Sequence, residues 1–202
     1  MPYQRIQWAH ITDPNVKAII HRADLLLGDV YTMCCKHPLK KTNAGGCQFS
    51  AVLVLLCIID ALAAYVYPAT KSMQKRKGVQ EKRFKKLIRE QLYWPASSMN
   101  KAQAASVLWK EFRNPLTHAT GLDEIAQHKR SGLDEPVAGI WGDVQPQRIS
   151  QVDRRKSWPD SWPILAPDRR TLRAATGKPA RLALTVAALY WSVKKLVRDL
   201  AK

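Results

Sequence analysis

Residues 108–122 hold two side chains with complementary chemistry. Arg113 and His118 lie five positions apart, with Asn114 and Pro115 between them. Arginine offers a permanently charged, planar group that suits phosphate, and histidine titrates near neutral pH and can carry a proton. With the 2′-hydroxyl of RNA as nucleophile, such a pair has the parts to cleave a phosphodiester without a metal. Arg113 would stabilise the developing charge and His118 would move the proton.

Pro115 decides whether the two side chains can meet. On an ideal helix, residues five apart point about 140° away from each other. A proline removes one backbone donor and clashes with the carbonyl four residues earlier, so we expect a kink or a restart of the helix here. Asn114 and Pro115 also suit an N-cap and a first helical position, next to which an anion is favoured. The alternative is a surface arginine with an unrelated histidine beside a kink, because this spacing also arises by chance.

The stretch Arg113-Asn114-Pro115-Leu116-Thr117-His118 resembles the signature of the HEPN superfamily. That signature is an arginine and a histidine separated by four to six residues, with a polar residue, often Asn, directly after the arginine. As in that family, the motif stands late in a helical chain and follows a very apolar helix. The resemblance covers about 14–122 and the last helix, and leaves 131–178 unexplained.

The resemblance implies a bundle of four or five helices and commonly a homodimer in which the two motifs face a shared cleft. It also implies an RNA endonuclease that needs no metal and no other cofactor, as found in toxin–antitoxin, CRISPR-linked and phage-defence systems. By position, Arg113 and His118 would be catalytic, and Asn114 would orient or contact the phosphate. RNA and an antitoxin or other regulatory protein would be the partners.

Some members of the family differ from this picture. Some carry a tyrosine two residues after the histidine that a partner enzyme modifies, but this chain has Thr120 there. Others have lost activity and serve as binding or scaffold domains. The alternative function is therefore a non-catalytic module that binds nucleic acid, a nucleotide or a partner protein.

Apolar periodicity and helix-breaking residues predict one all-α domain over 1–202, a bundle of about five helices. An irregular insertion at about 131–178, rich in Pro and Trp, precedes the last helix. Within this insertion we expect a β-hairpin around Gly142-Asp143, with strands at 137–141 and 144–152. The expected helices cover about 14–36, 49–67, 80–93, a fourth that Ser97 or Ser98 caps, and a last one that Lys178-Pro179 opens.

The segment 49–67 is nearly all apolar and almost long enough to cross a bilayer. Asp60 lies near its centre, where a charge opposes membrane insertion by about 2.5–3.5 kcal/mol. We therefore expect a central helix buried on all sides, with a membrane-associated basic protein as the alternative. A buried carboxylate needs a partner, and Arg113 is a plausible one. Asp60 is then either a purely structural pair or a support of the Arg113 site.

The charge balance of the 202 residues is strongly basic, with 33 Lys and Arg against 16 Asp and Glu and a net charge of +17. This excess points to a polyanion or an anionic surface as partner, although a simply soluble basic protein has the same property. Nine of the nineteen residues from Lys71 to Arg89 are basic. We expect a nucleic-acid track on the third helix, formed by Lys82, Arg83, Lys85, Lys86 and Arg89.

The four cysteines are too few and too clustered for a disulfide scaffold. Together with the absence of an apolar leader in the first fifteen residues, they place the chain in a reducing cytoplasm. Adjacent cysteines cannot easily bind one ion, and Cys-x2-Cys spacing is missing, so free thiols are expected and no metal site. The cysteines are Cys34, Cys35, Cys47 and Cys57.

Overall fold

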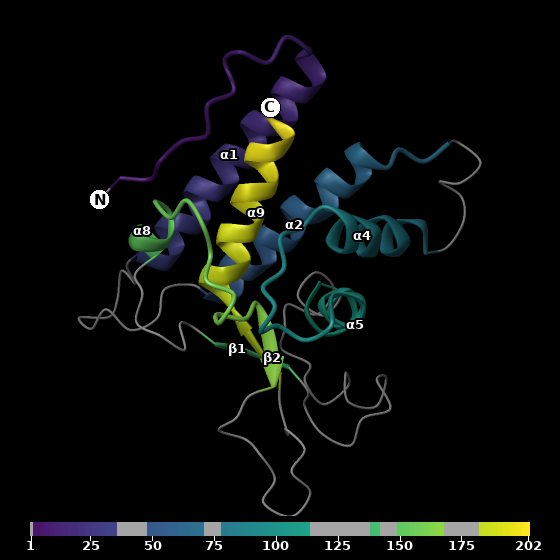
Figure 1. Cartoon of the computed structure of the whole chain (residues 1–202). Coiled ribbons are helices and arrows are strands. Elements are labelled where there is room, and N and C mark those ends of the chain that lie inside the picture. The colour runs from purple at the N-terminus through teal and green to yellow at the C-terminus, as the bar shows by residue number, and fades with distance from the viewer. Residues whose placement is uncertain (1, 36–47, 71–77, 114–137, 142–148, 168–181) are drawn as a thin grey trace, which may run out of the picture.

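A computed structural model describes residues 2–35, 48–70, 78–113, 138–141, 149–167 and 182–202. The chain is an all-α bundle with a small sheet at one end (Figure 1). Two strands of this sheet lie in the expected insertion, and the third lies between the insertion and the last helix. The helices are α1 Pro14–Cys35, α2 Gln48–Val66, α4 Val79–Glu90, α5 Lys101–Val107, the π-helix η1 Leu108–Arg113, the short α8 Ile149–Val152, and α9 Val186–Leu200. The strands are β1 Ala138–Trp141, β2 Leu165–Pro167 and β3 Leu182–Thr185.

The first three helices begin and end within about three residues of their predicted bounds. At α1, the side chain of Asp13 accepts hydrogen bonds from the backbone N–H groups of Asn15 at 2.8 Å and Val16 at 3.2 Å, as an N-cap should. The cap of α5 was predicted wrongly. It is Asn100, whose side chain accepts from the backbone N–H of Ala102 at 2.9 Å, in place of Ser97 or Ser98. Asn is among the strongest N-cap residues, and it directly precedes the helix.

The helix that is buried on all sides is α9, and the prediction that α2 has this place is wrong. Nine consecutive residues of α9, from Val186 to Lys194, are buried, and nine residues in a row cover every direction around a helix. On α2, Cys57, Ala61 and Tyr65 form an exposed line, each four residues from the next. The apolar composition of α2 therefore predicted burial correctly for one face of the helix and wrongly for the other.

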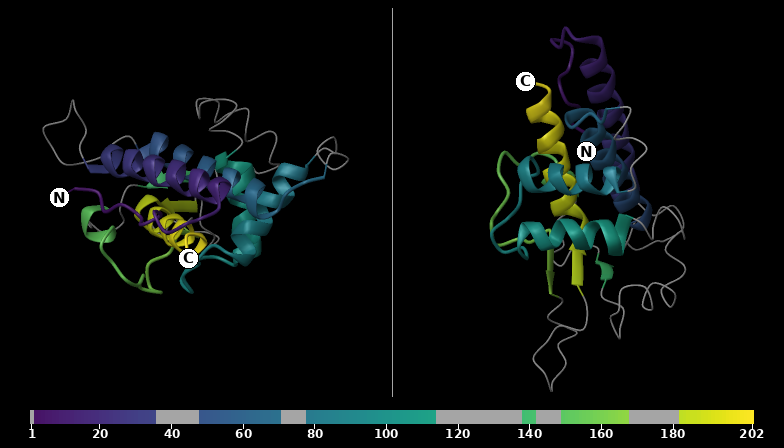
Figure 2. Two further views of the ribbon diagram at one scale, coloured as in Figure 1. Left: turned by 90° about the horizontal axis from the view of Figure 1, so that it is seen from above. Right: turned by 90° about the vertical axis from the view of Figure 1, so that its right-hand side faces the viewer.

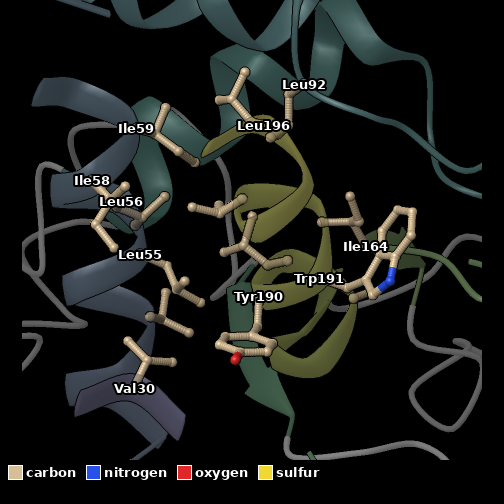
Figure 3. Packing of buried hydrophobic residues seen from close by; sticks show 14 of the residues in the cluster. Val30, Leu55, Leu56, Ile58, Ile59, Leu92, Ile164, Tyr190, Trp191 and Leu196 are labelled. Carbon is tan, nitrogen blue, oxygen red and sulfur yellow. The ribbon is translucent and has the colours of Figure 1, made fainter. Parts of the chain in front are cut away.

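Two layers enclose α9 (Figures 2 and 3). On one side, α2 contributes residues such as Leu55 and Ile59, and α1 contributes Val30. On the other side lies the segment that follows α8, where the ring of Trp158 is 5.9 Å from that of Trp191. The indole N–H of Trp191 donates to the backbone carbonyl of Arg155 at 3.1 Å. The Trp-rich insertion therefore covers the far face of α9.

The hairpin prediction is wrong in its second strand. β1 lies at 138–141 as expected, but Ile149–Val152 is helical, and 142–148 lie outside the described residues. β1 pairs in parallel with β3, β2 pairs antiparallel with β3, and the order is β1-β3-β2. β3 takes up residues that were expected in the last helix, which begins at Val186 and not near Lys178. A short apolar run such as 182–185 fits either period, and its two strand partners decide for the strand.

A buried polar cluster fixes the N-terminal segment to the bundle. Lys194 on α9 forms an ion pair with Asp153, which follows α8, and its Nζ donates to the carbonyl of Gln4 at 2.6 Å. The hydroxyl of Tyr190 donates to Asp153 at 2.5 Å. Burial lowers the pKa of Lys194, while the hydrogen bond with Asp153 acts in the opposite direction. These partners satisfy charges that would otherwise be costly to bury.

Candidate functional site

Arg113 is the last residue of η1, and the preceding residues anchor it firmly. Leu108, Trp109 and Phe112 are at most 7% exposed and belong to the core. The Trp109 ring also contacts the ring of Phe84 on α4, with centroids 5.2 Å apart. A π-helix is rare and is often found at functional sites. The chain thus departs from α-geometry before Pro115, and the kink expected at Pro115 itself lies outside the described residues.

Arg113 and Asp60 form the ion pair that the sequence suggested. Nη2 of Arg113 donates to Oδ2 of Asp60 at 2.8 Å, and the two side chains are 13% and 17% exposed. The pair joins the end of η1 to the middle of α2. Asp60 therefore has a partner inside the bundle, as a largely buried carboxylate requires.

Two further side chains complete this site, and the sequence analysis assigned neither of them to it. Gln80, in the first turn of α4, donates from Nε2 to the same Oδ2 of Asp60 at 2.5 Å. The guanidinium of Arg113 lies over the ring of Trp109, 4.5 Å from its centroid, where a cation is attracted to the ring. Three helices therefore hold one arginine. Trp109 and Arg113 are four residues apart, a spacing at which helical neighbours meet. The contacts of Asp60 join residues 20 and 53 positions apart, which the spacing along the chain does not predict.

Gly78 sets where α4 begins and thus where Gln80 lies. Its φ of 80° is in the left-handed region, which glycine adopts without steric cost. The backbone N–H of Lys82 then donates to the carbonyl of Gly78 at 3.0 Å, which closes the first turn of the helix. Gln80 is carried on that turn.

Cys57 lies one turn before Asp60 on α2. Its pKa is raised, first by desolvation of the thiol and also by the negative charge of Asp60, against the effect of Arg113. A raised pKa keeps the thiol protonated at neutral pH, and the thiolate is the reactive form. Cys57 is therefore not an activated nucleophile.

Asn114 and His118 fall within 114–137, which lie outside the described residues. Their roles, and their approach to Arg113, remain predictions. The site as described is thus the Arg113 half of the motif with its supports: Asp60, Gln80 and Trp109.

The predicted basic track on α4 separates into two groups. Lys82, Lys86 and Arg89 are exposed, and at 100° per residue they lie within about 60° of one another on the helix. Lys85 instead forms an ion pair with Glu81 at 2.5 Å, and Arg83 is partly buried. The five residues therefore do not form a single equivalent surface.

In the part of the chain that the structure describes, no group of three His, Cys, Asp or Glu side chains is placed to bind a metal. Over the same residues, no helix combines the length and the apolar character that crossing a bilayer requires. Comparison with protein-family models, with curated proteins and with solved structures finds no match for this chain.

Proposed function

We propose that the chain is a metal-independent RNA endonuclease of the HEPN type. The observation that carries the proposal is the fixed position of Arg113, which Asp60 and Trp109 hold at the residue where the motif begins. A guanidinium held in this way is preorganised to meet a phosphate without reorganising during the reaction. The basic face of α4 and the net charge of +17 favour a polyanionic substrate.

The reaction transfers one proton on each side of the phosphorus. The 2′-oxygen of a ribose forms a bond to phosphorus as its proton passes to a base, and the bond to the 5′-oxygen of the next nucleotide breaks as that oxygen gains a proton. The products are a 2′,3′-cyclic phosphate and a 5′-hydroxyl. His118 carries protons in this scheme, Arg113 offsets charge on the phosphate oxygens, and Asn114 contacts the phosphate.

A homodimer with a shared cleft would supply a second His118, so that one imidazole accepts a proton while the other donates one. The dimer follows from the resemblance, and three large apolar side chains of α1 and α2 are exposed. They are Leu25, Leu26 and Tyr65, which are 45%, 38% and 36% exposed. Light scattering coupled to size-exclusion chromatography tests the dimer, and a monomer at micromolar concentration contradicts it. An antitoxin or other regulatory partner is part of the same proposal.

The second candidate is a non-catalytic module that binds nucleic acid, a nucleotide or a partner protein. The observation that favours it is that Arg113 already has a carboxylate partner and is only 13% exposed. Asp60 offsets the charge that the proposed reaction requires, and a purely structural pair has the same geometry.

RNA degradation in the presence of EDTA separates the two candidates. The nuclease predicts cleavage by the wild-type chain with 2′,3′-cyclic phosphate ends, and its loss in both Arg113→Ala and His118→Ala. His128→Ala is the matched control, since this histidine lies outside the motif. Cleavage that requires a metal, or full activity in both motif variants, contradicts the nuclease. Salt-sensitive RNA binding without any product supports the binding module.

A further inference from the structure

The exposed face of α4 carries three cations in one line, none of which forms an ion pair within the part of the chain that the structure describes. Lys82, Lys86 and Arg89 follow one another at four and three residues, the spacing of neighbours along one side of a helix. The opposite side of the helix carries Phe84, Leu87 and Ile88, all 0% exposed. The line of charges is therefore mounted on a helix that the core holds in place.

The other two basic residues of α4 do not belong to this line. The ammonium of Lys85 lies 2.5 Å from the Glu81 carboxylate, one turn earlier, which offsets its charge. Arg83 points about 100° away from Lys82 and is partly buried. Among the described residues, Lys82, Lys86 and Arg89 are thus the basic side chains of α4 that are both exposed and outside an ion pair.

The length of the line fits a short run of phosphates. From Lys82 to Arg89 the helix rises about 10 Å, at 1.5 Å per residue. Neighbouring phosphates of one duplex strand advance about 3.4 Å along the helix axis, and those of an extended single strand lie farther apart. A line of about 10 Å can therefore contact two or three neighbouring phosphates of one strand.

Tyr67 holds the middle cation of the line. The Nζ of Lys86 lies 4.4 Å from the centroid of the Tyr67 ring, and the hydroxyl of Tyr67 donates to Glu90 at 2.7 Å. The cation–π contact restrains Lys86 without neutralising it. The same hydrogen bond directs the Glu90 carboxylate to Tyr67.

The line lies on the side of α4 that faces away from the Arg113 site, because Lys82 points about 160° away from Gln80 on the helix. Gln80, two residues before Lys82, contacts the carboxylate of Asp60 that also holds Arg113. We propose that Lys82, Lys86 and Arg89 form a phosphate track for single-stranded RNA, which runs along the outer side of α4. This inference rests on the proposed function and deepens it by naming the form of RNA. A single line of charges contacts one strand, and a flexible strand can reach the in-line geometry that attack by its own 2′-hydroxyl requires.

Salt-dependent binding tests the track. The probe is a fluorescein-labelled 2′-O-methyl oligouridine, which lacks the nucleophilic hydroxyl and so cannot be cleaved. Each phosphate contact on a single strand contributes about 0.7 to the slope of log K against log salt. The triple variant Lys82→Gln/Lys86→Gln/Arg89→Gln should therefore show a slope less steep by about 2, whereas Lys85→Gln should keep the wild-type slope. Circular dichroism verifies that each variant folds.

Several results would overturn the track. These are an unchanged slope in the triple variant, an equal effect of Lys85→Gln, or tighter binding of a 2′-O-methyl duplex of the same length. The nuclease assay and the salt-dependent binding assay can each fail without the other. If the wild-type chain binds the probe through the track but leaves RNA intact in EDTA, the nuclease is wrong and the track stands. If RNA is cleaved while the triple variant keeps its slope, the track is wrong and the nuclease stands.

Discussion

Oδ2 of Asp60 accepts the hydrogen bond from Nη2 of Arg113 at 2.8 Å, and so joins the middle of α2 to the last residue of η1. The same oxygen accepts from Gln80 on α4. The only residue of the proposed catalytic pair that the structure describes is thus fixed by a carboxylate whose charge opposes its own. An incoming phosphate must share Arg113 with Asp60, and this competition can be measured.

Asp60→Asn should strengthen binding of the 2′-O-methyl oligouridine probe and lower stability. Asparagine keeps an oxygen for Gln80 and Arg113 but removes the charge, so the guanidinium attracts phosphate more strongly. Loss of one charged hydrogen bond costs about 1–3 kcal/mol, to be measured by urea denaturation. Asp29→Asn, at an exposed position of α1, is the control and should change neither quantity. Unchanged affinity in Asp60→Asn would show that the pair does not compete with phosphate.

Two glycine substitutions should change stability in opposite directions. At Gly78, an added Cβ meets no atom within 4 Å, but the φ of 80° disfavours any other residue. Gly78→Ala should therefore destabilise the protein by about 1–2 kcal/mol. Gly28 is within α1, where an added Cβ lies in ordinary contact with the Tyr3 ring at 3.4 Å. Gly28→Ala should stabilise by up to about 1 kcal/mol, since alanine is the better helix former. Equal effects in denaturant titrations would contradict this assignment.

Removal of either partner of the buried Lys194–Asp153 pair should be strongly destabilising. Both side chains are 2% exposed, and Asp153→Asn leaves the Lys194 ammonium buried without its counter-charge. The expected loss is about 3–5 kcal/mol. The double variant Asp153→Asn/Lys194→Met should lose less than the sum of the single changes, because it no longer buries an unpaired charge. A strictly additive double-mutant cycle would mean that the two side chains do not interact.

Stability should fall at alkaline pH because of Tyr3 and Tyr190. Burial, and then hydrogen bonds to Asp24 and Asp153, raise both pKa values above the ordinary 10.0. A raised pKa gives stability that is present below pH 10 and lost as the pH rises beyond it, by about 1.4 kcal/mol per pH unit for each tyrosine. Lys194, whose pKa is lowered from 10.5, acts in the opposite direction below that value.

Urea titrations between about pH 10.5 and about pH 11.5 therefore isolate the tyrosines. Tyr190→Phe should reduce the loss of stability per pH unit without abolishing it, because the pKa values of Tyr3, Tyr67 and Tyr93 are also raised. Tyr65→Phe removes a tyrosine from the exposed side of α2 and should leave the loss as in the wild-type chain. If the wild-type chain, Tyr190→Phe and Tyr65→Phe all lost the same stability per pH unit, the buried hydroxyls would not be the cause of the loss.

Local signals in the sequence were sufficient for much of the helical framework. Asp13 before Pro14 identified the start of α1, and the charge of Asp60 within an apolar run identified a carboxylate that needs a partner. Asp60 and Arg113 were paired correctly because a buried charge narrows the choice of partners sharply. The roles of Asn114, His118 and Arg113 in chemistry remain predictions.

Features that depend on contacts far apart in the chain were not predictable in this way. β3 pairs with strands that begin or end at least 15 residues away in the sequence, so its four residues looked like the start of a helix. α9 has polar residues such as Ser192 and Lys194, which indicate an exposed face until Asp153 and Trp158 are placed against it. Gln80 carries no signal of its own, and only the fold brings it to Asp60.

The π-helix before the motif holds one extra residue in its turn without changing the direction of Arg113. Its hydrogen bonds span five residues where those of an α-helix span four, so this turn holds one residue more than an α-helical turn would. Loss of a single codon, for example that of the exposed Lys110, would let this turn return to α-helical winding, and the five remaining residues would cover about the same rotation as the six do now. Such a deletion would therefore preserve both the side chains of the motif and the direction of the Arg113 guanidinium.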